Sequence, residues 1–180
     1  MTTHIALLRA INVGGHKKVA IADLRGLVAE LGFDDVQSLL QTGNLVFRGG
    51  ARRGAGIERM LEAQAEERLE LSTTFFVRSA KDWEAIIAHN PFVDAARNDP
   101  GHLVVMFLKD APSASATKAL QAAIKGPEIV RSWKKHVYVA YPEGIGRSRL
   151  TNSIIEGKLG TRATGRNWNT VLKLAELARA

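Results

Sequence analysis

The chain has 180 residues, 46% of them hydrophobic, and a mean hydropathy of −0.07. These values exclude a disordered or fibrous protein, and the length suffices for one sizeable core or for two small subdomains. There is no cysteine, which excludes disulfides, thiol nucleophiles and thiolate metal sites. The formal net charge of +7 favours anionic partners, including nucleic acid and phosphorylated molecules.

The first half of the chain has the order β-α-β-β-α-β. Residues 4–11 alternate like a strand, and an apolar stripe from Leu24 to Leu31 predicts a helix that stops at Gly32. Two short apolar runs flank residues 41–44, a hairpin signal because Gly and Asn tolerate positive φ. A second helix follows from residue 57, with its glutamates at positions 58, 62, 66 and 67 expected to face outward. Residues 73–77 complete the pattern as a strand.

The second half repeats this order of elements without an obvious sequence repeat. A breaker-rich segment precedes a buried-type strand at 103–108, a helix capped by Ser113 or Ser115, and a hairpin around Lys134-Lys135. A helix near 150–159, a short strand near 162–164 and a terminal helix follow. We therefore predict an α+β protein of two ferredoxin-like subdomains with antiparallel sheets, plus a C-terminal helix. The expected bounds are 1–90 and 102–180, joined by a connecting segment at 91–101.

Three separated stretches resemble a known family. They are Leu7-Leu-Arg-Ala-Ile-Asn-Val-Gly-Gly15, Leu40-Gln-Thr-Gly-Asn44 and Ala163-Thr-Gly-Arg-Asn-Trp-Asn-Thr-Val171. In these motifs the chain is similar to the domain of unknown function 1697 family, a bacterial group. It departs from the family pattern at Thr42, where a serine is expected, and at Leu39, where a tyrosine is expected. The resemblance implies two α+β subdomains of ferredoxin-like character and implies no activity.

Most of the formal net charge lies in the C-terminal part of the chain. From Arg147 to Ala180 there are seven Arg or Lys and two Glu, so this stretch carries +5 of the +7. Asn167 is a credible N-cap, and Arg166 stands where the helix macrodipole is already positive. A bound anion would offset that repulsion, since free N–H groups at a helix start suit phosphate or carboxylate. The alternative is that the arginines pair with carboxylates elsewhere.

Two further places could contribute to an anion site. Strand alternation places Arg9 on the same face as Ile5 and Leu7, and a buried guanidinium needs a carboxylate, carbonyl groups or a bound anion. The loop after it, with Gly14-Gly15 and Lys18, fits neither established phosphate-loop template. Arg147-Ser-Arg-Leu-Thr-Asn152 offers hydroxyls and arginines at another helix start, where Ser148 or Thr151 can cap the following helix.

Catalysis and metal binding have little support. The five histidines show no metal-binding spacing, no G-x-S-x-G motif is present, and the basic stretches contain few acids. The sequence indicates no cofactor. Among the tryptophans, Trp83 is expected in the core, whereas Trp168 suits either the core or base stacking.

These observations favour a protein that binds a phosphate-bearing anion, with RNA as the leading partner. An enzyme acting on a small phosphorylated or nucleotide substrate and a protein-interaction module without catalysis are the alternatives. The predicted anion-binding residues are Arg9, Asn12, Lys18, Arg147, Thr164, Arg166, Asn167 and Lys173. The N-terminus lacks the features of a signal peptide, and no apolar run is long enough to span a bilayer, so we expect a cytoplasmic protein with no membrane partner. The oligomeric state is not indicated.

Overall fold

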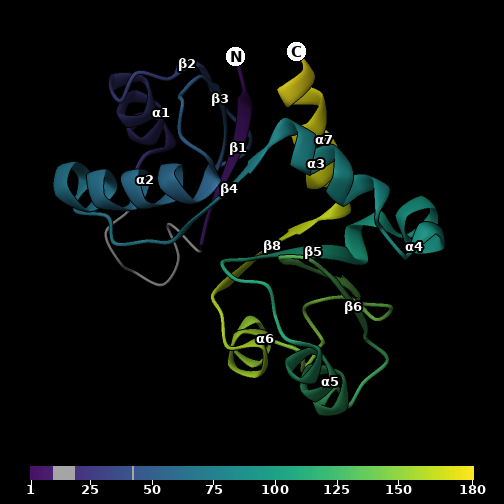
Figure 1. Ribbon diagram of the computed structural model, residues 1–180. Helices are drawn as coiled ribbons and strands as arrows, with labels where there is room; N and C mark the ends of the chain where they lie inside the picture. Colours follow the sequence, from purple (N-terminus) through teal and green to yellow (C-terminus); the bar gives the residue numbers. More distant parts are fainter. Residues whose placement is uncertain (10–18, 42) are drawn as a thin grey trace. The chain divides into compact units, whose positions relative to one another are not determined.

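The computed structural model describes residues 1–9, 19–41 and 43–180. The chain forms two compact units (Figure 1). Unit 1 comprises Met1–Ala85 together with Leu174–Ala180, and unit 2 comprises Ile86–Lys173. This division differs from the expected bounds of 1–90 and 102–180, because the last residues of the terminal helix group with the first unit. There, Arg179 forms an ion pair with Glu84 at 2.7 Å.

Unit 1 is a four-stranded antiparallel sheet with two helices between its strands. The strand order is β2-β3-β1-β4, which is the ferredoxin-like topology. The elements are, in chain order, β1 (Thr3–Leu8), α1 (Ile21–Glu30), β2 (Asp34–Ser38), β3 (Asn44–Arg48), α2 (Gly54–Leu69) and β4 (Phe75–Ser79). Alternate residues of β1, Ala6 and Leu8, point to the same core as Leu24, Leu61 and other apolar residues of the helices.

Unit 2 repeats this topology. Its strand order β6-β7-β5-β8 corresponds position by position to that of unit 1. The elements are β5 (Leu103–Leu108), α5 (Ala114–Ala123), β6 (Ile129–Trp133), β7 (His136–Ala140), α6 (Asn152–Leu159) and β8 (Ala163–Asn167). Helices α5 and α6 lie side by side (Figure 1) and share a core with the sheet. The predicted α+β fold with two ferredoxin-like antiparallel sheets is therefore confirmed.

Three further helical segments complete the chain. They are α3 (Ala80–Ala88), α4 (Val93–Asn98), with a single 3-10 turn at Pro100–His102, and α7 (Trp168–Arg179). The division between the units runs through α3 and through α7. In the part of the chain that the structure describes, no helix has both the length and the apolar character that crossing a membrane requires.

The last strand of each sheet is an edge strand, and a preceding helix protects its outer side. Glu58 of α2 accepts a hydrogen bond from Val77 N at 2.9 Å, and Glu62 accepts one from Phe75 N at 3.0 Å. In unit 2, Glu156 of α6 accepts from Ala163 N at 3.2 Å. The expectation that Glu58 and Glu62 face solvent is wrong, because unpaired N–H groups of β4 draw both carboxylates to the sheet edge.

Candidate anion-binding site

Unit 2 contains a cavity of about 390 Å³ between two of its connecting loops. One wall is the α5–β6 connection, with Lys125 and Glu128, and the other is the β7–α6 connection, with Glu143, Arg147 and Arg149. Apolar side chains also line the cavity, among them those of Ile124, Leu150 and Ile154. The cavity therefore combines three cations, two carboxylates and an apolar surface.

Local signals in the sequence shape both loops. Helix α5 starts at the N-cap Ser113, whose side chain accepts from Ala116 N, and stops before Gly126-Pro127, since proline cannot continue a helix. Helix α6 starts at Thr151, whose hydroxyl accepts from Ile154 N at 3.3 Å. Both caps were predicted among the alternatives, and together they fix where each loop begins or ends.

A hydrogen bond joins the two walls of the cavity. The Ser148 hydroxyl donates to Glu128 Oε1 at 2.5 Å and accepts from Leu150 N at 3.0 Å. The Tyr141 hydroxyl donates to Leu150 O at 3.3 Å. Burial, with a smaller contribution from the charge of Glu128, raises the pKa of Tyr141 to about 12, so this hydroxyl keeps its proton at neutral pH. These bonds hold the residues around Arg149 in place.

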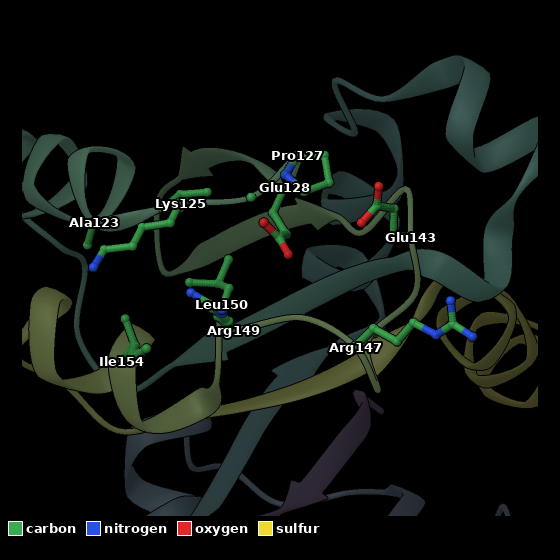
Figure 2. A pocket seen from close by; sticks show the side chains of 11 residues that line it. Ala123, Lys125, Pro127, Glu128, Glu143, Arg147, Arg149, Leu150 and Ile154 are labelled. Carbon is green, nitrogen blue, oxygen red and sulfur yellow. The ribbon is translucent and has the colours of Figure 1, made fainter.

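The cations of the cavity are not held in ion pairs within the described part of the chain. In the described residues, no carboxylate lies within ion-pair distance of Lys125, Arg147 or Arg149, although Glu128 and Glu143 line the same cavity. Figure 2 shows the Glu128 carboxylate in the middle of the lining, with Lys125 on one side and Glu143 and Arg147 on the other. The guanidinium of Arg147 points away from Glu128 in this view. Since Arg147 is exposed, its side chain is able to change rotamer rapidly.

The charge of the whole chain resides in unit 2. Residues 86–173 contain thirteen Lys or Arg and six Asp or Glu, a formal net charge of +7, whereas unit 1 contains twelve of each and is neutral. The electrostatic attraction that the composition predicts therefore belongs to the unit that holds the cavity.

The predicted residues of β8 have structural partners. Arg166 Nη1 donates to Thr164 Oγ1 at 2.9 Å and to Gly165 O at 2.8 Å, so it helps to saturate this edge strand. Burial lowers the pKa of Arg166 to about 10, which leaves the guanidinium charged at neutral pH. Asn167 is the predicted N-cap of α7, since its Oδ1 accepts from Thr170 N at 3.0 Å. The structure thus brings Thr164 and Arg166 together. However, Thr164, Arg166 and Asn167 all form hydrogen bonds within the protein.

The other predicted residues lie in different places. Arg147 lines the cavity, whose lining includes neither Lys173 nor any residue of β8, and Lys173 is exposed on α7. Arg9 lies in unit 1, directly after β1. Its backbone N donates to Thr74 O at 3.1 Å and so extends the pairing of β1 with β4 by one hydrogen bond. Asn12 and Lys18 lie outside the described residues, as does the Gly14-Gly15 loop. That these residues contact an anion stays a prediction.

Aromatic side chains offer little surface for base stacking. Trp83 and Trp168 are buried, which confirms the core position expected for Trp83 and decides between the two options for Trp168. Trp133 is half-buried, with the His89 ring stacked on it at 4.0 Å and the Lys134 ammonium 4.8 Å from its ring centre. On the sheet of unit 2, Tyr138 is buried and donates to Ile86 O at 2.6 Å. Its ring is therefore not open to a base.

Reasoning from the sequence missed Lys125, Glu128 and Arg149. Arg149 belongs to the basic stretch that was singled out at a helix start, so a local signal for it existed. Nothing in the sequence places Lys125 and Glu128 opposite that stretch, because their proximity depends on how β6 and β7 pair.

Comparisons with known proteins identify relatives without assigning an activity. The model of a family described as "Protein of unknown function (DUF1697)" matches residues 1–138. Among solved structures, the chain is similar to "conserved bacterial protein SP0830 from Streptococcus pneumoniae", with a TM-score of 0.77 and 22% identity over 98% of both chains. At this identity the likeness establishes the fold. No curated protein sequence matches the chain.

Proposed function

Since the chain belongs to the DUF1697 family, whose function is unknown, we propose a function from the site itself: unit 2 binds a phosphate-bearing anion in its cavity. The observation that carries the proposal is the set of three cations, Lys125, Arg147 and Arg149, that line the cavity without an ion-paired carboxylate. Phosphate oxygens accept charge-assisted hydrogen bonds, which are shorter and stronger than neutral ones, and arginine donates two of them at once.

Electrostatics and size both support this proposal. The three cations outnumber the two carboxylates of the lining, and unit 2 as a whole carries +7, so an anion is attracted over a distance of about a Debye length, roughly 8 Å at physiological salt. A volume of about 390 Å³ falls within the roughly 300–1,000 Å³ typical of small-molecule sites. The apolar residues Leu150 and Ile154 provide contact for a non-phosphate part of the ligand.

The phosphate could belong to a small molecule or to RNA. Three cations that line one cavity favour a small phosphorylated ligand, whereas RNA, the partner favoured by composition, would be held at many positions along its backbone. Titration with pyrophosphate, a mononucleotide, and short and long oligoribonucleotides separates the two sources. Affinity that grows with oligonucleotide length and falls steeply with salt identifies RNA.

Substitution of Arg149 by alanine tests the site. We expect Arg149→Ala to weaken the binding of pyrophosphate about tenfold or more, measured by isothermal titration calorimetry, because a charge-assisted hydrogen bond is lost. Lys118→Ala is the matched control, because it also removes one positive charge. Lys118 is an exposed residue of α5 that does not line the cavity. Equal losses in the two variants would show that only the net charge matters and would contradict a site in the cavity.

Catalysis on a phosphorylated substrate and binding to an acidic protein are the alternative functions of the same cations. An enzyme acting on a phosphorylated substrate would use the same cations to stabilise charge, and an interaction module would present them to an acidic protein. A cytoplasmic location is part of this proposal, since nucleotides and RNA are abundant there, and cell fractionation tests it.

A further inference from the structure

The cavity contains a carboxylate where a site for phosphate alone would have none. Glu128 lies in the middle of the lining (Figure 2), and its charge opposes any ligand that is only an anion. A carboxylate acts solely as an acceptor, so what it favours is a ligand with an N–H or O–H donor.

The hydrogen bonds of Glu128 leave one of its oxygens available. Oε1 accepts from the Ser148 hydroxyl at 2.5 Å, and in the described part of the chain no hydrogen bond reaches Oε2. Because Ser148 Oγ also accepts from Leu150 N, the hydroxyl hydrogen is directed at Oε1 and fixes which oxygen is used. The second oxygen is thus a positioned acceptor.

Gly126 makes room for this arrangement. A Cβ atom at position 126 would lie 2.4 Å from Glu128 Oε2, which is closer than atoms pack, so a side chain there would displace the carboxylate. The atom that must move is the far end of a flexible side chain, and the substitution would therefore shift Glu128 at little cost to the fold.

From these contacts we infer that Glu128 determines specificity: the cavity takes a nucleotide whose base carries an exocyclic amino group, with the amino group donating to Glu128 and the phosphate held by Lys125, Arg147 or Arg149. The apolar lining of Ile124, Leu150 and Ile154 gives the base a surface to pack on. This inference rests on the proposed phosphate site.

The test compares two nucleotides that differ by one group. Adenosine monophosphate and the same nucleotide without its amino group are titrated by calorimetry into the full chain, with pyrophosphate as a third probe. The intact protein is expected to prefer the aminated nucleotide about fivefold or more, the effect of one hydrogen bond to a charged acceptor. Equal affinities for the two nucleotides, together with measurable pyrophosphate binding, would overturn the inference while leaving the phosphate site standing.

Two variants separate the role of the carboxylate from its structural contribution. In Glu128→Gln, the Ser148 hydroxyl keeps the amide oxygen at the Oε1 position, so the amide nitrogen occupies the Oε2 position and donates instead of accepting. The preference for the aminated nucleotide should vanish or reverse, and pyrophosphate should bind more tightly because a negative charge is gone. In Gly126→Ala, the preference should fall while pyrophosphate affinity changes less than about twofold.

The outcomes distinguish the two claims. An unchanged nucleotide preference in Glu128→Gln would contradict a contact with Glu128. Failure of the intact protein to bind pyrophosphate and both nucleotides would overturn the phosphate site and this inference together. Circular dichroism of each variant confirms that it is folded.

Discussion

Single residues show how burial couples side chains to pH. His4 of β1 is only 3% exposed, its Nε2 lies 3.1 Å from Gly49 O, and the rings of Phe33 and Phe47 surround it. Its Nδ1 has no hydrogen-bond partner in the described part of the chain. With Nε2 donating to Gly49, protonation of Nδ1 would place a charge in an apolar environment.

Acidification should therefore destabilise the protein through His4. Desolvation lowers the pKa of His4 from 6.5 in the folded state, partly offset by the bond to Gly49. The unfolded chain then binds the proton at a higher pH than the folded chain, so the free energy of unfolding falls as pH falls below about 6.5. Urea denaturation between neutral pH and pH about 5 should show a smaller fall in the free energy of unfolding for His4→Gln, because glutamine does not titrate. Parallel curves for the two proteins would contradict this role.

The basic residues differ in how the structure uses them. Arg166 is engaged by Thr164 and Gly165 within β8, whereas Arg149 has no ion pair within the described residues and lines the cavity. We expect Arg166→Ala to lower stability more than Arg149→Ala, because removal of Arg166 leaves acceptors of the edge strand unsatisfied. Thermal denaturation of the two variants checks this order. A larger loss of stability in Arg149→Ala would mean that Arg149 is held by the fold.

Among the secondary-structure elements, the N-cap of α7 makes a contribution to stability that a single substitution can measure. Asn167 Oδ1 accepts from Thr170 N at 3.0 Å, which satisfies one of the free N–H groups of the first turn. Asn167→Ala should destabilise the protein by about 1 kcal/mol in chemical denaturation. Asn169→Ala, an exposed position in the same turn, should change stability by less than about 0.5 kcal/mol. Similar losses in both would argue against the cap.

The contact between helix α2 and the edge strand β4 makes a larger contribution to stability. Glu58 is 8% exposed, accepts from Val77 N and lies 3.5 Å from the guanidinium of Arg78, itself 7% exposed. Glu58→Ala leaves that buried cation without this carboxylate and should cost about 3 kcal/mol or more. Glu66→Ala on the exposed side of α2 is the matched control and should be nearly neutral. A loss below about 1 kcal/mol for Glu58→Ala would contradict the proposed importance of the pair.

Features that depend on interactions between residues close in sequence could be predicted, whereas features that depend on distant residues could not. The caps at Asn167 and Thr151 and the strand at Leu103–Leu108 depend on neighbours a few residues away, so periodicity and residue type sufficed. The burial of Glu58 depends on β4, about twenty residues further along the chain. The meeting of Lys125 and Glu128 with Arg149 depends on the pairing of β6 with β7, which local patterns do not specify.

For the whole molecule, two units of the same topology differ in charge. Unit 1 is neutral and unit 2 carries +7, although both use a glutamate from the helix before the last strand to cover the sheet edge. The glutamate that covers the sheet edge is a feature of the shared fold. The net charge of unit 2 does not follow from this topology, so we attribute it to function. The positive charge of unit 2 therefore supports an anion-binding function in that unit.

Binding of a phosphate group in the cavity of unit 2 is tested by an amide correlation spectrum of the isotope-labelled full chain, titrated with pyrophosphate. Saturable shift changes should concentrate at residues 124–128 and 143–150, the two loops that form the cavity, and should weaken in Arg149→Ala. Changes that concentrate instead at the arginines near the start of α2, Arg52, Arg53 and Arg59, or that spread evenly over the basic surface, would contradict a phosphate site in this cavity.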